Sequence, residues 1–541
     1  MVKVEPGREM GMKNIVPDDL NVLRESGGQW ALFDVREPAE ADAGHILGAC
    51  TLPRRMIELR IGDLVADRDT PIVLYDDGAS GRALYAGRTL ESLGYRDLRI
   101  LAGGTASWLE SGRRLMTGSN VPGKLFGERV HEAKQVPYIS PGTLKAWQEE
   151  GKDHIVCDIR TPSEYEEARV PGAYGAFGVD LALLADDLKK QNRPVVVHCA
   201  GRTRSIIACQ SLRELGLPEV YALENGTMGW RLAGFELEKG PARGVMSPTQ
   251  QSRASGRELA SAKAALAGAG VVEAAQLAQW LAARAAKKMN LYMYDVRQVD
   301  EYVSGHIPGA IALPGGLAIQ RADDFMPIRQ APVVFVDDGG GRAYLTAFWF
   351  REMGWRNVHV LLDGTAGWAA AGQPLEAGRV RSAPLGFEQA CAQASKISPE
   401  ALAELSPQPL VVHVDTSRSY EEARVPGSIW IPYGWLEGRI QKHAASLDAP
   451  VVLVCRSGTH SMYAAANLKR LGYRAVQALE GGTDAWRRHH RAEQGWPADV
   501  ARERDLVVPP YHSSLADMDQ YLKWEVRLSA AIADAIAAGS A

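Results

Sequence analysis

The sequence predicts an α/β protein built from four repeated units, each a parallel sheet flanked by helices. One observation is an ending of the form Gly-Thr-x-x-x-Trp, which recurs at intervals of about 120 to 140 residues, the size of a small domain. A second is an apolar run before each ending, followed by a short loop and a helical stretch. Strands that alternate with helices in this way are typical of parallel sheets. The four endings begin at Gly104, Gly226, Gly364 and Gly482.

The apolar run of each unit predicts its central strand. The runs contain β-branched residues without polar alternation, as expected of a strand that is buried on both faces. They cover residues 71–75, 194–198, 332–336 and 450–454. The helix after each run is expected to end at a glycine, because glycine adopts the left-handed conformation that terminates helices. These glycines are Gly94, Gly216, Gly354 and Gly472.

An earlier strand in each unit is expected to end in an aspartate. The four aspartates are Asp34, Asp158, Asp295 and Asp415. The first three are followed by an arginine two residues later, but Asp415 is not. The stretch from Asp415 to Pro426 is also two residues shorter than the stretch from Asp158 to Pro171.

The units alternate in type in the order A-B-A-B. Units two and four share the octapeptide YEEARVPG at residues 165–172 and 420–427, whereas units one and three carry Gly-His-Ile at residues 44–46 and 305–307. One duplicated pair explains this order most simply. The linker over residues 239–275, rich in Gly, Ser, Gln and Ala, divides the two pairs. It is interpreted as a flexible joint that passes into an amphipathic helix over about residues 264–286.

We therefore predict four domains and a tail. The boundaries are 1–120, 121–242, 243–380 with the linker helix, 381–498 and the helical tail 499–541. A helix is expected in the tail from about residue 514 to 538, packed against the fourth unit or a subunit partner. The oligomeric state, including a homo-oligomer, stays open.

The composition excludes several function classes. The 61 basic and 65 acidic residues give a net charge of −4, and no concentrated basic surface for nucleic acid is visible. Residues 1–15 lack the apolar core of an export signal, and residues 264–286 hold too many polar groups for a membrane span. Six cysteines without a Cys-x-x-Cys pair predict reduced thiols, a cytoplasmic location and no zinc site.

Two cysteines open the loop after the central strand, where an open α/β sheet places its chemistry. They are Cys199 and Cys455. A tight loop that enters a helix directs several backbone N–H groups at one point, which favours an anion and the thiolate form of cysteine. We expect these two cysteines to be functional and the other four to act as small apolar groups. Those four are Cys50, Cys157, Cys209 and Cys391.

The other residues of both loops are candidates for binding an anionic substrate group through N–H groups and side chains. His198 and His460 are weaker candidates for a catalytic base. The candidate binding residues are Ala200, Gly201, Arg202, Thr203, Arg204 and Ser205 after Cys199, and Arg456, Ser457, Gly458, Thr459, His460 and Ser461 after Cys455.

These motifs resemble those of the rhodanese family, and the chain is similar to a tandem of four rhodanese domains over about residues 15–490. The motifs are Asp-x-Arg followed by Gly-His-Ile-x-Gly-Ala, the cysteine loop and the Gly-Thr-x-x-x-Trp ending. The resemblance extends to two-domain rhodaneses, in which an inactive domain precedes an active one. It implies two inactive/active pairs, in which the inactive unit forms a wall of its partner's active-site cleft.

Units one and three depart from the family pattern at the cysteine position, which is occupied by Asp76 and Asp337. An aspartate there cannot carry sulfur. Its carboxylate could accept the N–H groups of the loop itself, with Arg82 or Arg342 as an ion-pair partner. The alternative is that these units are simply decayed copies.

Loop length separates two chemistries. Cysteine phosphatases and arsenate reductases of related shape need Cys-x5-Arg, which places an arginine six residues after the cysteine. In this chain Arg204 comes only five residues after Cys199, and His460 stands five residues after Cys455. Both loops are one residue too short to surround a phosphate, and they resemble the loop of sulfurtransferases. Cys455-Arg456-Ser457-Gly458 is also similar to the Cys-Arg-x-Gly pattern of thiosulfate-using rhodaneses, which implies that its arginine meets a sulfonate.

The resemblance implies a double displacement without metal or organic cofactor. A thiolate takes the outer sulfur of a small anionic donor such as thiosulfate, and a thiophilic acceptor, cyanide or a thiol, removes it from the resulting persulfide. The different sequences after the two cysteines suggest different donors or acceptors. The second function class that stays open is a catalytically weak rhodanese-type protein-binding module or sulfur-relay scaffold.

Overall fold

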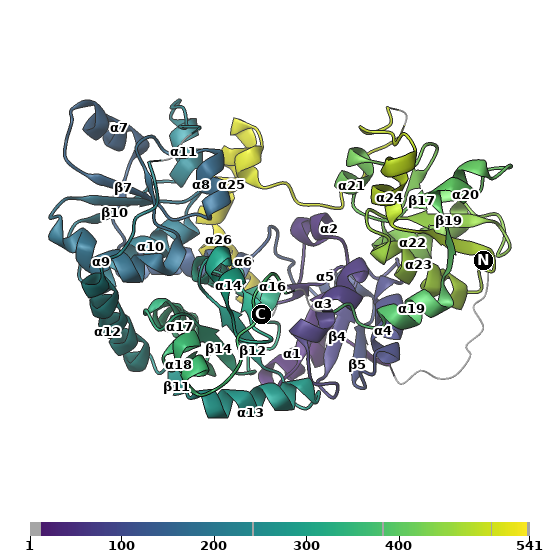
Figure 1. The fold of residues 1–541 in the computed structure, drawn as a ribbon, viewed down its shortest axis with the longest axis horizontal. Coiled ribbons are helices and arrows are strands. Elements are labelled where there is room, and N and C mark those ends of the chain that lie inside the picture. Colours follow the sequence, from purple (N-terminus) through teal and green to yellow (C-terminus); the bar gives the residue numbers. More distant parts are fainter. Residues whose placement is uncertain (1–11, 241–242, 381–382, 499, 538–541) are drawn as a thin grey trace. The chain divides into compact units, whose positions relative to one another are not determined.

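The computed structural model describes residues 12–240, 243–380, 383–498 and 500–537 of the 541-residue chain. These residues form two compact units (Figure 1). Unit 1 combines the described residues before 120 with residues 383–498 and 500–507, and unit 2 combines residues 120–240 and 243–380 with residues 508–537.

Each unit holds two domains, and each domain is built on one five-stranded parallel sheet flanked by helices. In the first domain the strand order is β1-β5-β4-β2-β3, and the other three sheets repeat this order. The strand before the cysteine or aspartate loop is therefore always the middle strand, and all four of its residues are buried in every domain. This confirms the predicted α/β class and the predicted central strands.

Unit 1 contains the first and fourth domains. The first domain comprises β1 (Lys13–Ile15), α1 (Pro17–Glu25), β2 (Ala31–Asp34), α2 (Pro38–Ala43), β3 (Cys50–Thr51), η1 (Arg54–Met56), α3 (Ile57–Leu64), β4 (Ile72–Tyr75), α4 (Arg82–Ser92), β5 (Leu98–Leu101) and α5 (Gly104–Glu110). The fourth comprises α19 (Phe387–Gln393), β16 (Ser395–Ile397), α20 (Pro399–Glu404), β17 (Leu410–His413), α21 (Ser417–Glu422), β18 (Ile429–Trp430), α22 (Tyr433–Arg439), η3 (Ile440–Lys442), β19 (Val451–Val454), α23 (Thr459–Arg470), β20 (Val476–Leu479) and α24 (Gly482–His489).

Unit 2 contains the second and third domains and the tail. The second domain comprises α6 (Val121–Lys134), β6 (Tyr138–Ile139), α7 (Pro141–Glu149), β7 (Ile155–Asp158), α8 (Pro162–Glu167), β8 (Tyr174–Gly175), η2 (Gly178–Asp180), α9 (Leu181–Lys190), β9 (Val195–His198), α10 (Thr203–Glu214), β10 (Val220–Leu223) and α11 (Gly226–Leu232). After α12 (Gln250–Leu266), the third comprises β11 (Gly270–Val272), α13 (Ala274–Ala285), β12 (Tyr292–Asp295), α14 (Val299–Ser304), β13 (Ile311–Ala312), α15 (Gly315–Gln320), α16 (Ala322–Phe325), β14 (Val333–Val336), α17 (Arg342–Glu352), β15 (Val358–Leu361) and α18 (Gly364–Ala370). The tail comprises η4 (Pro510–His512), α25 (Leu515–Val526) and α26 (Leu528–Ala537).

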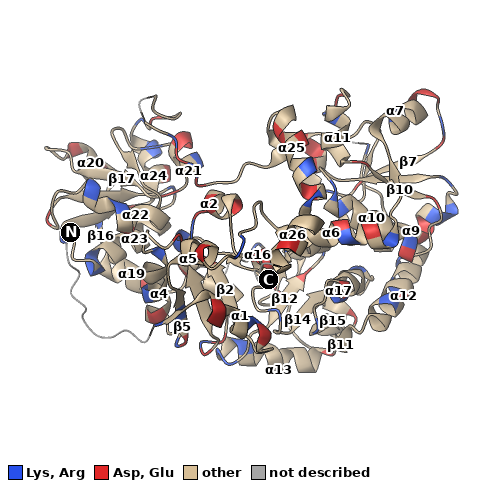
Figure 2. Cartoon of the chain, turned by 180° about the vertical axis from the view of Figure 1, so that it is seen from behind, with Lys and Arg blue, Asp and Glu red and all other residues tan. Residues whose placement is uncertain are grey.

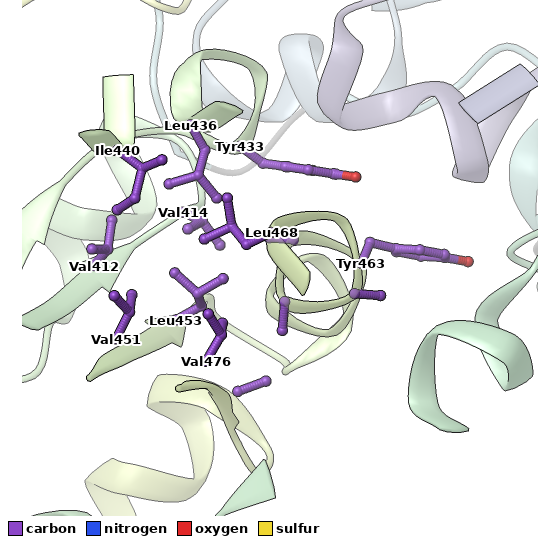
Figure 3. Close-up of a cluster of buried hydrophobic side chains, with 14 of the residues drawn as sticks. Val412, Val414, Tyr433, Leu436, Ile440, Val451, Leu453, Tyr463, Leu468 and Val476 are labelled. Atoms are coloured by element: carbon purple, nitrogen blue, oxygen red, sulfur yellow. The ribbon is translucent and has the colours of Figure 1, made fainter. Parts of the chain in front are cut away.

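The core of the fourth domain shows how the sheets are held (Figure 3). Val412 and Leu453 from neighbouring strands pack against Leu436 of α22 and Leu468 of α23, and all four are fully buried. Burying an aliphatic side chain of this size contributes about 1.5 to 3 kcal/mol. The sheet and its covering helices therefore hold β19 firmly, and with it the loop that follows.

The Gly-Thr-x-x-x-Trp ending clamps that loop in every domain. In the second domain, the amide of Thr227 donates to the carbonyl of Cys199 over 2.9 Å. Gly226 has a φ of +55°, and a Cβ there would lie 2.2 Å from the same carbonyl oxygen, so only glycine fits. Trp230 is buried in the core behind it. The motif therefore lies against the candidate site although it is distant from it in sequence.

The register of the fourth sheet corrects one sequence alignment. β17 ends at His413, which pairs with Val454, just as Asp158 pairs with His198 in the second sheet. His413 is thus the counterpart of Asp158, and Asp415 stands two residues beyond the strand, at the position of Arg160. The apparent shortening before Pro426 was a misalignment. The fourth domain instead carries a different set of charges at this edge of the sheet.

The linker prediction is also wrong. Residues 264–286 do not form one helix, because α12 ends before Gly268, whose φ is +84°, and β11 joins the third sheet by pairing with β15. α12 packs on α9 and α17 instead of acting as a flexible joint. Its buried residues Ser252, Gly256, Ala260 and Ala264 form a small-residue stripe that permits close packing. A Cβ at Gly256 would lie 1.8 Å from the carbonyl oxygen of Ala182.

The domains pair differently from the sequence prediction. We expected pairs of units one with two and three with four, but the compact units join the first domain to the fourth and the second to the third. The physical reason is that α12 fastens the second domain to the third, and α22 of the fourth packs on η1 and α4 of the first. Each pair still combines one aspartate loop with one cysteine loop.

The tail forms two helices rather than the single predicted one, and residue 538 lies outside the described ranges. α25 packs on α11 and α6, and α26 packs on α6, so the tail covers the second domain rather than the fourth. Figure 1 shows α25 beside α11, far along the chain from it. None of the helices in the described ranges is long and apolar enough to cross a membrane. Figure 2 shows basic and acidic residues interspersed over both units.

Candidate active sites

The loop after β19 forms an anion-binding nest around the sulfur of Cys455. The amides of Gly458 and Ser461 donate to Cys455 Sγ over 3.1 Å and 3.4 Å. The Ser461 hydroxyl oxygen lies 3.5 Å from the same sulfur. Burial raises the pKa of the Cys455 thiol, whereas the hydrogen bonds from Ser461 and Gly458 act in the opposite direction because they stabilise the thiolate. The nest can therefore hold a charged sulfur.

Arg456 and two hydroxyl groups lie at the mouth of this loop. The Arg456 side chain is 61% exposed, and its nitrogens lie 3.5 Å from Glu422 and 3.7 Å from Asp484. Ser457 Oγ donates to Thr459 Oγ1 over 3.2 Å. Such long, solvated ion pairs are weak. The guanidinium can therefore turn toward an incoming anion.

His460 and Asp415 form a pair beside the same loop. His460 Nδ1 lies 3.6 Å from Asp415 Oδ1, and the buried Nε2 has no hydrogen-bond partner among the described residues. Burial opposes ionisation of Asp415, but the neighbouring His460 and the hydrogen bond from the Thr416 amide hold the pKa of this carboxyl well below its usual range. Asp415 Oδ2 also accepts the Arg456 amide over 3.3 Å. The sequence placed Asp415 in a strand, so this contact was missed.

The Cys199 loop has the same length but a different interior. Cys199 Sγ lies 3.4 Å from Ser205 Oγ, and within the described part of the chain no backbone amide donates to this sulfur. Arg202 stands where the other loop has Gly458, with φ of −119° instead of +93°. The nest expected from the sequence is therefore formed at Cys455 but not at Cys199.

Both arginines of the Cys199 loop are engaged by carboxylates. Arg202 forms a two-pronged pair with Glu128 of α6, with both distances 2.7 Å, and Arg204 forms one with Glu164 of α8, at 2.9 Å and 2.7 Å. Fork-to-fork pairs of this kind are strong and directional. We expected these arginines to clamp an anionic substrate group, and the pairs leave them less available for that role.

The glutamate partner of Arg204 carries a sequence signal that we did not use. Glu164 is the third residue of a helix that begins with a Thr-x-x-Glu capping box. Glu40 and Glu301 stand at the same helix position in the first and third domains, and they pair with Arg82 and Arg342. A glutamate at this position, together with an arginine at the start of the helix that follows the central strand, therefore predicts a glutamate–arginine ion pair.

Replacement of Glu164 tests this pair through pH. Although burial disfavours its charge, Arg204 and the hydrogen bonds from Thr161 lower the pKa of Glu164 to about 2. A carboxyl with a lowered pKa in the folded state contributes stability above its unfolded pKa and loses it as the pH falls. We expect acid to remove up to about 3 kcal/mol between about pH 5 and pH 2. In Glu164→Gln this part of the pH dependence should be absent from urea titrations of unit 2, whereas Glu166→Gln, an exposed change on the same helix, should keep it.

The tail contributes a residue to the Cys199 loop. Thr203 Oγ1 donates to Glu525 Oε1 of α25 over 2.7 Å. Met228, Met518 and Leu522 form a small apolar cluster between α11 and α25. The sequence assigned no chemistry to the tail, and no local pattern reveals that it reaches a loop some three hundred residues earlier.

The aspartates of the first and third domains occupy the nest with their own carboxylates. Asp76 accepts the amides of Gly78 and Ala83 over 2.7 Å and 3.0 Å. Asp337 accepts three amides at 2.7 to 3.1 Å, from Gly339, Gly341 and Ala343. This is the arrangement expected from the sequence, since the carboxylate takes the place of a bound anion.

The predicted ion-pair partners of these aspartates are wrong. Arg82 pairs with Glu40 and Asp77 rather than with Asp76. Arg342 likewise pairs with Glu301, Asp180 and Asp338 rather than with Asp337. The loop amides already satisfy Asp76 and Asp337, so the arginines serve neighbouring carboxylates.

A pocket lies between the second and third domains within unit 2. Thr203 and Arg204 at the start of α10 line it together with Gly316, Ile319 and Gln320 of α15. Most of the remaining lining is aliphatic. The third domain thus forms one wall of a pocket beside the Cys199 loop, the role that the resemblance implied for the first domain.

The remaining cysteines do not lie in such loops. Burial raises the pKa of Cys157 on β7 and of Cys209 on α10 to about 12. A thiol with so high a pKa is protonated at neutral pH and acts as an apolar group. Burial lowers the pKa of His198, and the side chain is fully buried, out of contact with solvent. In the described ranges, no group of three or more His, Cys, Asp or Glu residues could hold a metal ion.

Comparison with known proteins identifies the family of the chain. The family model of the rhodanese-like domain matches residues 16–111, 140–233, 277–371 and 398–489. The crystal structure of a thiosulfate sulfurtransferase from Pseudomonas aeruginosa is similar over 98% of both chains, with 33% identity and a TM-score of 0.86.

Two curated relatives are similar over parts of the chain. The sulfur carrier protein TtuD of Thermus thermophilus is 32% identical over 32% of this chain and 72% of its own. The thiosulfate sulfurtransferase GlpE of Pseudomonas fluorescens is 36% identical over 19% of this chain and 94% of its own. With four matched domains, the chain belongs to the rhodanese family of sulfurtransferases.

Proposed function

We propose that the protein transfers sulfane sulfur from a donor such as thiosulfate to a thiophilic acceptor through a persulfide on Cys455, with Cys199 as a second site. The observation that carries this proposal is the pair of amide hydrogen bonds from Gly458 and Ser461 to the Cys455 sulfur. The same groups can hold the outer sulfur of a persulfide, which carries the charge after transfer.

The reaction is a double displacement. The Cys455 thiolate attacks the outer sulfur of thiosulfate, the sulfur–sulfur bond of the donor breaks, and its electron pair leaves with sulfite. The enzyme then carries a persulfide anion, so charge is conserved. Cyanide attacks the outer sulfur and leaves as thiocyanate, which restores the thiolate. This is covalent catalysis with ping-pong kinetics.

The residues around Cys455 supply the remaining roles. Arg456, exposed and loosely paired, meets the sulfonate of the donor. His460 of the same loop, which lies beside Asp415, is the candidate for exchanging a proton with an acceptor thiol. The nest requires no metal or organic cofactor for these steps.

Mass spectrometry of the intact protein with peptide mapping tests this function. The protein is incubated with thiosulfate, and separately with the persulfide of 2-mercaptoethanol, and then treated with cyanide. We expect one cyanide-removable sulfur on the Cys455 peptide with thiosulfate, and one on the Cys199 peptide with at least one of the donors. Cys199→Ser and Cys455→Ser assign each signal to its cysteine.

Absence of sulfur from both peptides with both donors would contradict the enzymatic function. Rhodanese domains without such uptake would then act as a protein-binding module or a scaffold for sulfur relay. Sulfur on Cys455 alone with both donors would restrict the chemistry to the fourth domain.

A further inference from the structure

The two cysteine loops differ in the charge that faces them. At Cys455 the exposed group is a cation, Arg456. At Cys199 both loop arginines are tied to carboxylates, and a third carboxylate, Glu525, is added by the tail. An anionic donor therefore meets an available positive charge at one site and not at the other.

Glu525 is buried and faces the Cys199 loop. Its side chain is 1% exposed, and Oε2 has no hydrogen-bond partner among the described residues, whereas Oε1 accepts from Thr203. Oε2 lies 3.6 Å from the point where a Cβ of Gly201 would be, next to Met228 and Leu522. An unpartnered carboxylate oxygen therefore lies against the backbone of the loop that Cys199 opens.

Other charged and titratable groups face Glu525 from each element around it. Lys124 and Glu128 belong to α6, Arg202 to the loop, and Tyr521 to α25 itself. Burial and Glu128 raise the pKa of Glu525, while Lys124, Arg202 and the Thr203 hydroxyl favour its charged form. Lys124 Nζ lies 5.0 Å and 4.9 Å from the ring centres of Tyr521 and Trp524. Lys124 therefore contacts the rings of α25 and also acts on the charge of Glu525.

We propose that Glu525 is a specificity-determining residue of the Cys199 site, which excludes the thiosulfate dianion and directs this site to sulfane sulfur donors that lack a sulfonate, such as an alkyl persulfide. This inference rests on the proposed function, since it assumes that Cys199 accepts sulfur. A carboxylate repels a dianion at close range, and this repulsion is smaller for a donor that carries less negative charge. The donor step at Cys199 follows the same course as at Cys455. The Cys199 thiolate attacks the outer sulfur of the alkyl persulfide, the sulfur–sulfur bond of the donor breaks, and the alkyl thiolate leaves with the electron pair.

The test uses the full chain with Cys455→Ser, so that sulfur uptake is followed at Cys199 alone. Glu525→Gln keeps an oxygen for the Thr203 hydroxyl but removes the charge. Asp519→Asn, on the same helix but paired with Lys523 at the surface, is the matched control. Initial rates of persulfide formation on the Cys199 peptide are measured with thiosulfate and with the persulfide of 2-mercaptoethanol.

We expect Glu525→Gln to raise the rate with thiosulfate about 10-fold or more and to change the rate with the alkyl persulfide little. Asp519→Asn should leave both rates unchanged. Equal thiosulfate rates with and without the Glu525 charge would overturn the inference while leaving sulfur transfer intact. If Glu525→Gln, but not Asp519→Asn, abolished sulfur uptake from both donors, Glu525 would be required for the structure of the loop, and its role in donor specificity would be refuted. If the Cys455→Ser protein with Glu525 intact took up no sulfur at Cys199 from either donor, the proposed function of this site would itself be refuted.

Discussion

Replacement of Cys455 by serine is expected to lower the rate of thiocyanate formation from thiosulfate and cyanide by about 1,000-fold or more, because no other group at this nest can carry the persulfide. A serine hydroxyl keeps the volume and the hydrogen bonds of the loop but is not a nucleophile without a base. The amides of Gly458 and Ser461 would then face an uncharged oxygen.

Steady-state thiocyanate assays of three variants check this result. Cys391→Ser is the matched control, since Cys391 is a free, partly buried cysteine of the same domain on α19. It should leave the rate unchanged. If Glu525 excludes thiosulfate from the second site, Cys199→Ser should also retain most of the activity. A Cys455→Ser protein with more than half of the original rate would place the thiosulfate chemistry elsewhere.

The second large effect is expected from Arg54, which joins the two domains of unit 1. Arg54 is fully buried and donates to Glu437 Oε1 over 2.8 Å and to Tyr433 Oη over 3.0 Å on α22, and to Glu58 on α3. Burial raises the pKa of Glu437, and Arg54 counteracts this by stabilising its charge. Arg54→Met leaves two buried carboxylates without their cation. Removing one partner of a buried ion network costs about 3 to 5 kcal/mol.

Urea unfolding of unit 1 and hydrogen exchange of the α22 amides measure this cost. Arg54→Met should lower the unfolding midpoint and expose α22 to exchange. The triple change Arg54→Met, Glu58→Leu and Glu437→Leu should recover much of the stability, because an apolar cluster replaces the network. Arg474→Met, which removes an exposed pair with Asp448, should change little. Equal stability of Arg54→Met and the original protein would mean that the domains are joined by apolar packing alone.

The pairing of domains explains why each unit combines one aspartate loop with one cysteine loop. In unit 2, the third domain supplies α15 to the pocket beside Thr203 and Arg204. In unit 1, α22 of the fourth domain packs on α4, which begins at the end of the aspartate loop of the first domain. A self-filled nest needs no ligand, so such a domain can serve as a rigid wall for its partner.

The sequence by itself determined the repeat, the sheet in each repeat and the loops that carry the cysteines and aspartates. These features depend on residues close together in the chain: apolar runs such as 450–454, glycines such as Gly472 that end helices, and the short path from a strand to a helix. The filling of the nest by Asp76 was also predictable, because the carboxylate and the amides belong to one loop.

Only the tertiary structure decided which domains pair, which carboxylates engage Arg202 and Arg204, and that Glu525 reaches the Cys199 loop. These contacts join residues far apart in the chain, and their free energy comes from the fit of surfaces that no local pattern records. The predicted register of the strand that ends at His413 was wrong for a related reason. Pairing with Val454 is set by hydrogen bonds across the sheet, whereas the aspartate motif suggested a position two residues away.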